Sequence, residues 1–230
     1  MKFAIRDDDI SYHTDVNILK YLYEDISKVC PISFSCIPYV GGYDIENFTP
    51  DKWSQFDVQW IKWQTSEIYP IDKNKELVTS LREWCDNDRA SIMLHGIHHD
   101  LFEFTQDKDF TDEIKEAKKY LENIFKRRVC VASPPNNSLG ISATLALEEN
   151  NFNILTAFGH YPNERPFSLK NYFNFARLLH LYFLHGKRRR LTHPLVFENH
   201  SEQPCYEIGP MTKYEDLVSG LKFSIKNNGN

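Results

Sequence analysis

The feature that most constrains the fold is a repeated alternation of short strand-like runs with amphipathic helical segments. Apolar runs end in Gly, Pro or polar clusters, and stretches with apolar residues at helical spacing follow them. This alternation predicts parallel strands with helices packed outside, because a parallel pair needs a crossover connection. The predicted strands lie at 3–5, 32–40, 91–94, 129–132, 154–156 and 195–197. The predicted helices lie at 14–29, 77–84, 112–126, 142–149, 170–185 and 213–223.

A single domain over residues 1–230 is the simplest organisation of the chain. Of its 230 residues 41% are hydrophobic, which is enough to build one core, and we find no internal linker, repeat or low-complexity segment. Residues 43–72, rich in Trp and Asp, show no clear periodicity. They are predicted to form a long loop or a small insertion, and such a loop is commonly functional.

The N-terminal segment is charged rather than apolar, and no stretch approaches the ~20 apolar residues of a membrane helix. Five cysteines without metal-finger spacing fit reduced thiols, with two disulfides and one unpaired thiol as the alternative. The net charge is −5 and the one dense basic run, 187–190, is short, which argues against a nucleic-acid partner. We therefore expect a cytoplasmic protein with no membrane span.

Polar clusters follow the first and third predicted strands. Three adjacent aspartates at 7–9 repel one another unless a cation or a basic group compensates, although a surface turn or helix cap would also explain them. His95 and His99 follow the strand at 91–94, and on a helical turn this spacing puts both imidazoles on one face. Such a pair suits a divalent metal, but a lone pair is more often structural.

Strand ends from distant parts of the sequence meet at one edge of a parallel sheet. An aspartate there would complete a three-ligand site with an open position, the form of catalytic zinc sites. Two looser clusters follow later strands: the Pro-containing segment 133–137 and His200, each of which could equally be a plain turn. His193 competes with His200 but falls at the start of its predicted strand.

In this order the clusters resemble the motifs of the polysaccharide deacetylase superfamily, which includes chitin-oligosaccharide and peptidoglycan deacetylases. The strand ending in aspartates at 5–10 is similar to its first motif, and the His-x-x-x-His at 95–99 to its second. Segments 133–137 and 197–200 are similar to its Pro-containing loop and its strand ending in His. The resemblance spans nearly the whole chain. It implies an α/β fold, a distorted (β/α) barrel with fewer than eight parallel strands.

The resemblance also implies a metal-dependent deacetylase centre. Asp8 would be the general base and Asp9 a metal ligand, with Asp7 and Asp8 as the fallback register. His95 and His99 would complete the ligand set of a divalent metal, for which zinc is the expected ion.

The later motifs supply the other implied roles. His200 would be the second catalytic residue and protonate the leaving amine, while Pro135, Asn136 and Asn137 would bind substrate, with a backbone N–H near Asn136 holding the oxyanion. The substrate would be a small N-acetylated sugar or glycoconjugate.

The chain departs from the family pattern in two places. The third motif usually carries an Arg that orients the catalytic Asp, and its place is taken here by Ala132 or Ser133. The fourth motif, an Asp–Trp element, is not recognisable between 157 and 170, and Arg6 or Arg165 could supply the missing positive charge. Two alternatives follow: a non-catalytic relative that binds carbohydrate or a protein partner, and a hydrolase acting on a non-sugar amide.

Overall fold

The computed structural model describes residues 4–43, 64–100, 103–156, 195–196 and 200–204, with single positions between 169 and 222. Its strands are β1 (Ile5–Ile10), β2 (Ile32–Cys36), β3 (Tyr39–Tyr43), β4 (Gln64–Pro70), β5 (Ala90–Leu94), β6 (Val131–Ala132), β7 (Asn153–Thr156), β8 (Leu195–Val196) and β9 (Ser201–Pro204). Its α-helices are α1 (Val16–Tyr23), α2 (Lys75–Asp86), α3 (Thr111–Phe125) and α4 (Ile141–Glu149).

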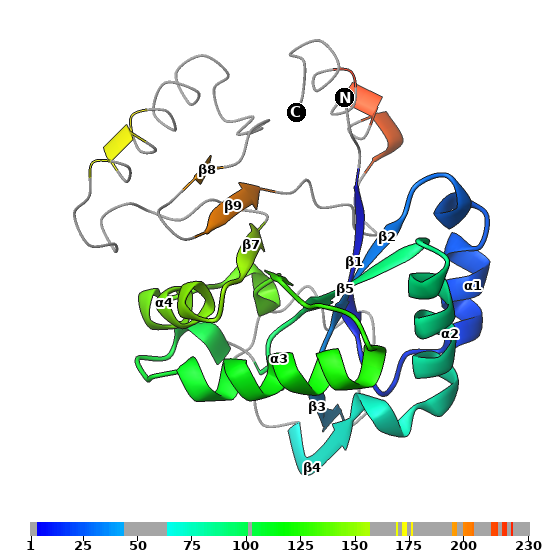
Figure 1. The fold of residues 1–230 in the computed structure, drawn as a ribbon, viewed down its shortest axis with the longest axis horizontal. Coiled ribbons are helices and arrows are strands. Elements are labelled where there is room, and N and C mark those ends of the chain that lie inside the picture. The colour runs from blue at the N-terminus through cyan, green and yellow to red at the C-terminus, as the bar shows by residue number, and fades with distance from the viewer. Residues whose placement is uncertain are drawn as a thin grey trace.

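The main sheet has seven strands in the order β1-β2-β5-β6-β7-β9-β8. All neighbours from β1 to β9 are parallel, whereas β8 runs antiparallel to β9. The sheet curves, and the four helices lie along its outer face (Figure 1). Within the described residues the end strands β1 and β8 do not pair. The fold is therefore a distorted, open (β/α) barrel with fewer than eight parallel strands, as predicted.

The outer face of the sheet carries the apolar core. Phe34 of β2 is fully buried, and its ring lies 5.8 Å from that of Trp84 on α2. Leu81 is buried one turn earlier on the same helix face, and each such side chain contributes roughly 1.5–3 kcal/mol by leaving water. The helix begins after Asn74, whose side chain accepts the Leu77 N–H and so satisfies an otherwise unpaired donor.

The inner face is polar instead. In the strand register Arg6 of β1 lies beside Ser33 of β2, which lies beside Ser91 of β5, and the two hydroxyls are 3.0 Å apart. Because successive side chains of a strand alternate between faces, these residues point away from the core that holds Phe34. Asp8, two residues after Arg6, continues this polar row towards the end of β1.

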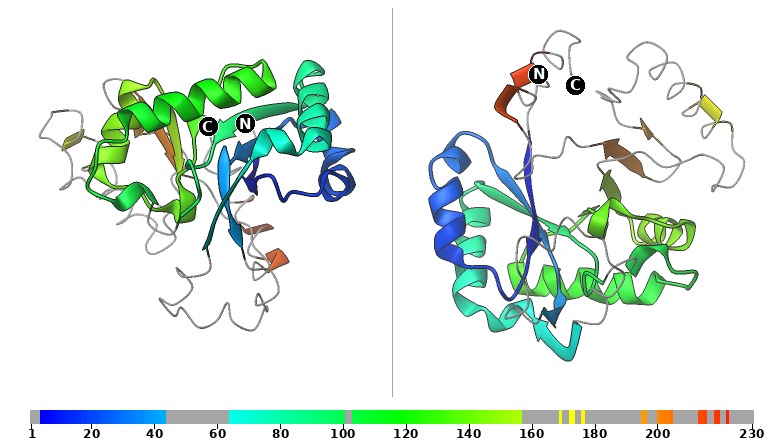
Figure 2. Two further views of the ribbon diagram at one scale, coloured as in Figure 1. Left: turned by 90° about the horizontal axis from the view of Figure 1, so that it is seen from below. Right: turned by 180° about the vertical axis from the view of Figure 1, so that it is seen from behind.

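The predicted strand at 32–40 is interrupted. β2 ends at Cys36 and β3 begins at Tyr39, because Pro38 between them has no N–H to offer a sheet. Residues 43–72 were predicted to be irregular, but their described part contains a strand. β4 pairs antiparallel with β3, and Val40 lies beside Tyr69. Residues 44–63 lie outside the described residues. The ribbon of β3 and β4 is visible below the sheet in Figure 1 and in the right view of Figure 2.

Three other elements differ from prediction. α1 ends at Tyr23 and a short 3-10 turn follows, so the predicted helix at 14–29 is too long. β8 is antiparallel, and the last parallel strand is β9, which the sequence did not indicate because Ser-Glu-Gln-Pro carries no apolar alternation. Most of the predicted helices at 170–185 and 213–223 falls outside the described residues. Within the described ranges none of the helices combines the length and apolar character needed to cross a membrane.

Candidate metal centre

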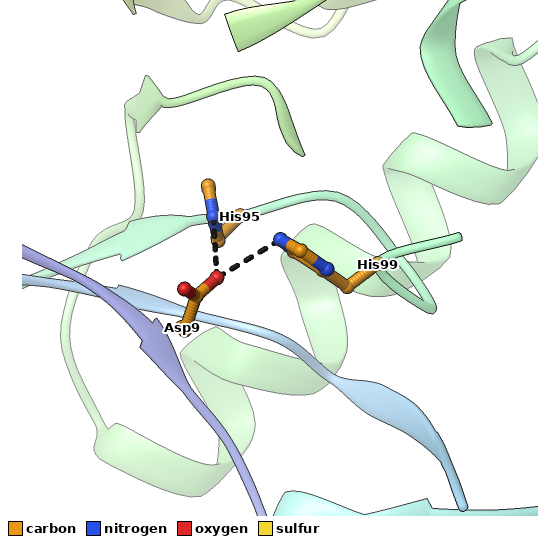
Figure 3. Close-up of side chains that lie close together, drawn as sticks. All are labelled: Asp9, His95 and His99. Carbon is orange, nitrogen blue, oxygen red and sulfur yellow. Dashed lines mark hydrogen bonds and ion pairs between the residues drawn. The ribbon is translucent and has the colours of Figure 1, made fainter. Parts of the chain in front are cut away.

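Three side chains from two separate parts of the chain meet at the edge where β1 and β5 end. Asp9 lies near the end of β1, His95 directly follows β5, and His99 lies in the next loop. Both imidazoles point at the Asp9 carboxylate (Figure 3). Asp9 Oδ1 is 3.1 Å from His95 Nε2 and 2.9 Å from His99 Nε2, and one ligand atom of each residue lies within 4.8 Å of the other two. The structure thus brings together the three residues that the sequence indicated as ligands.

Unusual backbone conformations place these ligands. Asp9 and His99 have positive φ angles of 65° and 63°, and the β1–β2 register shifts between Asp7 and Ile10. Left-handed backbone at a non-glycine residue costs roughly 1–2 kcal/mol, and such strain clusters at functional sites. At Gly96, φ is +68°, and a Cβ there would overlap Glu103 Oε2 and Pro135 Cγ, so only glycine fits this turn.

The environment of His95 fits a bound cation. Its Nδ1 is 2.8 Å from the carbonyl oxygen of Ser133, which can only accept, so Nδ1 carries the proton. In a neutral ring, Nε2 then presents its lone pair to Asp9 Oδ1, and two such acceptors repel unless a proton or metal ion lies between them. Two ligands of one zinc ion, each about 2.0–2.2 Å from it, lie roughly 3 to 3.5 Å apart, close to the spacing seen here. The donor set therefore fits a divalent metal.

Exposure differs sharply across the cluster. The side chain of His95 is 4% exposed and that of His99 16%, whereas that of Asp9 is 69% exposed. Partial desolvation by the surrounding protein favours the neutral form of the Asp9 carboxyl, although its side chain is mostly exposed. Hydrogen bonds and charge from the two imidazoles outweigh this and hold the pKa of Asp9 well below its usual range. Burial of His99 acts to lower its pKa, but Asp9 raises the pKa more strongly. The imidazoles are thus anchored in the protein, and the solvent side of the centre is open to water or substrate.

Asp8 lies beside this cluster and is held by a different partner. Its Oδ2 is 2.7 Å from Arg6 Nη2, and Arg6 Nη1 donates to the carbonyl of Leu155 on β7 at 3.3 Å. Asp8 Oδ1 is buried and has no hydrogen-bond partner among the described residues. One oxygen is therefore fixed by Arg6 and the other is left without a donor in this part of the chain, an arrangement that suits a proton acceptor. Arg6 places a positive charge beside Asp8, whereas Arg165 lies outside the described residues.

Asp7 points to the other face of the sheet. Burial raises the pKa of its carboxyl to about 6, opposed by a hydrogen bond with Tyr23 of α1 and supported by the charges of Asp8 and Asp9. The three adjacent carboxylates thus have three different environments, which relieves their repulsion. This arrangement fits Asp8 and Asp9, not Asp7 and Asp8, as the base and ligand pair.

Replacing Asp7 by Asn should flatten the pH dependence of stability. The folded-state pKa of about 6 exceeds the unfolded value of 3.8, so the contribution of this carboxyl is fully present below the lower value and is lost as pH rises through the higher one. Between pH 4 and pH 7.5 the free energy of unfolding of Asp7→Asn, relative to wild type, should rise by roughly 2–3 kcal/mol. Urea unfolding of both proteins in chelator measures this. A constant difference would contradict the assignment.

The Pro-containing loop after β6 lies against the histidine loop, and the substrate-binding role expected of it stays a prediction. Pro135 is buried against Gly96 in the histidine loop, so its ring is covered. Asn136 is exposed, and Asn136 and Asn137 have positive φ angles of 53° and 51°. Because Ser133 in the same segment accepts from His95 and Pro135 lies against Gly96, the loop lies next to the candidate ligands.

His200 is not brought to the cluster. Its side chain is fully buried and its Nδ1 is 3.4 Å from Glu148 Oε1, near the end of α4. It precedes β9, which runs parallel to β7, so it lies at the edge where strands begin, opposite the edge that holds His95. A general acid must reach the leaving group within about 3 Å, which this position does not allow. His193 lies outside the described residues.

One further residue near the ligands was missed by sequence reasoning. Glu103 is only 5% exposed, and its carboxylate accepts the backbone N–H groups of Ile97, His98 and His99. Burial raises the pKa of Glu103, against the effect of these hydrogen bonds. The sequence offers no signal for this contact, because the partners of Glu103 are backbone N–H groups.

No protein-family model matches the chain, and no curated protein sequence matches it. Among solved structures, the chain is similar to a CE4 family pseudoenzyme from Bacillus anthracis, at 10% identity over 66% of this chain and 42% of that chain, with a TM-score of 0.41. It is also similar to Streptococcus pyogenes deacetylase PplD in complex with acetate, at 12% identity over 66% and 54%, with a TM-score of 0.42. The polysaccharide deacetylase Bc1974 from Bacillus cereus matches at 11% identity over 100% and 89%, with a TM-score of 0.44.

Bc1974 is described as a polysaccharide deacetylase, the superfamily name that the sequence motifs suggested for this chain. The aligned part spans 42% and 54% of the first two structures, which is less than two thirds of either. At such identities and TM-scores the matches transfer no residue role to this chain.

Proposed function

We propose that the chain is a metal-dependent hydrolase that removes an acetyl group from an N-acetylated sugar or sugar conjugate. The observation that carries this is the contact of Asp9 Oδ1 with two imidazole nitrogens, at 2.9 and 3.1 Å, next in the chain to a second carboxylate, Asp8, whose buried Oδ1 has no hydrogen-bond partner within the described ranges. A cation site next to a base is what amide hydrolysis requires. The sugar part of the substrate comes from the resemblance of the motifs.

Asp9, His95 and His99 would hold the metal. Two nitrogens and one oxygen form a donor set that zinc accepts, so zinc is the ion we propose. When bound, such an ion lowers the pKa of water towards neutrality and polarises a carbonyl oxygen.

Asp8 would move the proton. Its Oδ1 would take the proton from the attacking water, while Arg6 on Oδ2 fixes the orientation of the carboxylate. Since His200 lies at the opposite edge of the sheet, the protonated Asp8 would return this proton to the leaving amine. A backbone N–H near the exposed Asn136 would hold the oxygen of the tetrahedral intermediate, an interaction worth roughly 3–4 kcal/mol in comparable sites.

Acetate release tests this function. Purified protein is assayed for metal content and then incubated with N-acetylhexosamines, their short oligomers and non-sugar N-acetyl amides. We expect acetate release from the sugars, loss of release in chelator and recovery when zinc is added back.

Unchanged release in the chelated protein would refute the metal mechanism. Release from the non-sugar amides alone would identify an amidohydrolase of another substrate class. Metal binding without release from any compound would favour the non-catalytic alternative.

A further inference from the structure

The loop that carries His99 is wrapped around a single buried carboxylate. Glu103 Oε1 accepts the N–H groups of Ile97 at 3.1 Å and His98 at 2.9 Å, and Oε2 accepts those of Ile97 at 3.1 Å and His99 at 3.2 Å. Three consecutive backbone donors on one anion form a nest, an arrangement that binds negative charge. The loop that joins the two histidine ligands is thus built around Glu103.

Glu103 is itself attached to a rigid part of the fold. The next residue, Phe104, is 1% exposed, packs edge-on against Phe110 before α3, and accepts the N–H of Gly140 before α4 at 2.7 Å. The carboxylate is therefore attached to the helical layer as well as to the loop, whose Asp100 carbonyl accepts the Glu103 N–H at 3.0 Å. Movement of the loop would leave a buried carboxylate and three N–H groups without partners, which is costly.

The other side of the loop is bound to the start of β3. Tyr39 N–H donates to the carbonyl of Ile97 at 3.0 Å, and His98 Nδ1 donates to the carbonyl of Tyr39 at 2.9 Å. His98 therefore has a partner of its own and stays outside the metal-ligand set. Together with the positive φ of His99, these contacts fix the backbone from which the His99 side chain reaches Asp9.

We infer that Glu103 is a positioning residue of the metal centre, whose carboxylate holds the loop so that His99 reaches the ion. The inference rests on the metal site of the proposed function. A residue that orients a metal ligand typically changes metal affinity 10- to 100-fold when it is replaced. A residue that only contributes to the core would lower stability and leave the affinity of the folded protein unchanged.

Glu103→Gln is the test, because it keeps the size of the side chain and replaces one acceptor oxygen by a donor. Glu122→Gln is the matched control: Glu122 on α3 also accepts a backbone N–H, that of Val129 at 3.0 Å, but does not contact the histidine loop. Each protein is titrated with Co²⁺, followed by its absorption bands, and with Zn²⁺ in competition with a coloured chelator. We expect Glu103→Gln to bind both ions about 10- to 100-fold more weakly, with altered Co²⁺ bands, and Glu122→Gln to match wild type.

A measurement on wild type covers the case in which Glu103→Gln does not fold. Hydrogen exchange of the amides of Ile97, His98 and His99 should be slow in the metal-free protein, since each donates to Glu103. Fast exchange at all three would overturn the inference, as would wild-type affinity in Glu103→Gln, and neither result affects the proposed function. If wild type binds neither ion, the metal site itself fails, and this inference fails with it.

Discussion

His95→Ala should lower the affinity for a divalent metal by roughly 100- to 1000-fold and reduce acetate release to background. A bound structural zinc contributes about 10–16 kcal/mol through four ligands, so losing one ligand removes several kcal/mol. His95 is the ligand that the protein holds most firmly, because Ser133 fixes Nδ1 and only 4% of the side chain is exposed. Isothermal titration with Zn²⁺ and the acetate assay measure the two effects.

His98→Ala is the control for this result. His98 lies in the same loop, but its ring donates to Tyr39 and is absent from the ligand cluster. Replacing His98 should reduce metal affinity far less than replacing His95. Equal losses in the two variants would mean that the loop, and not the imidazole of His95, determines binding.

The sequence predicted those parts of the fold whose pattern is local. α2, α3 and β5 were found within two residues of their bounds, because apolar spacing decides helix and strand there. β4 and β9 were missed, since their pairing depends on partners distant in the chain. The position of His200 was misjudged for the same reason: it was placed after the strand at 195–197, and the structure begins another strand beside it.

The candidate site, like the fold, has parts that the sequence predicted and parts that it did not. His95, His99 and the aspartates could be named from the sequence because polar clusters at the ends of parallel strands meet at one edge. Asp9 was named as the ligand with a fallback register, because which aspartate faces the imidazoles depends on the positive φ of Asp9, which breaks the alternation of β1. The role of Glu103 was equally hidden, because its partners are backbone N–H groups that any sequence carries.

Asp8→Asn should lower kcat about 100- to 10,000-fold, the usual contribution of a general base, while Zn²⁺ affinity stays close to that of wild type. Asp8 is bound to Arg6 and takes no part in the ligand cluster, so its amide leaves the metal ligands in place. The same substitution one residue later, Asp9→Asn, should instead lower Zn²⁺ affinity, because Asp9 Oδ1 is the oxygen shared by both imidazoles. Zn²⁺ titration and steady-state kinetics on the two variants separate base from ligand.

Arg6→Gln extends this test. The ion pair with Asp8 links Arg6 to the centre, so loss of Arg6 should lower kcat less than Asp8→Asn and leave Zn²⁺ affinity unchanged. In the double variant of Asp8→Asn with Arg6→Gln, kcat should fall little below that of Asp8→Asn alone, because a positioning residue has no effect once its target is removed. Additive losses would show that Arg6 acts on the substrate directly. A loss of Zn²⁺ affinity in Asp8→Asn but not in Asp9→Asn would make Asp8 the ligand and return the register to Asp7 and Asp8.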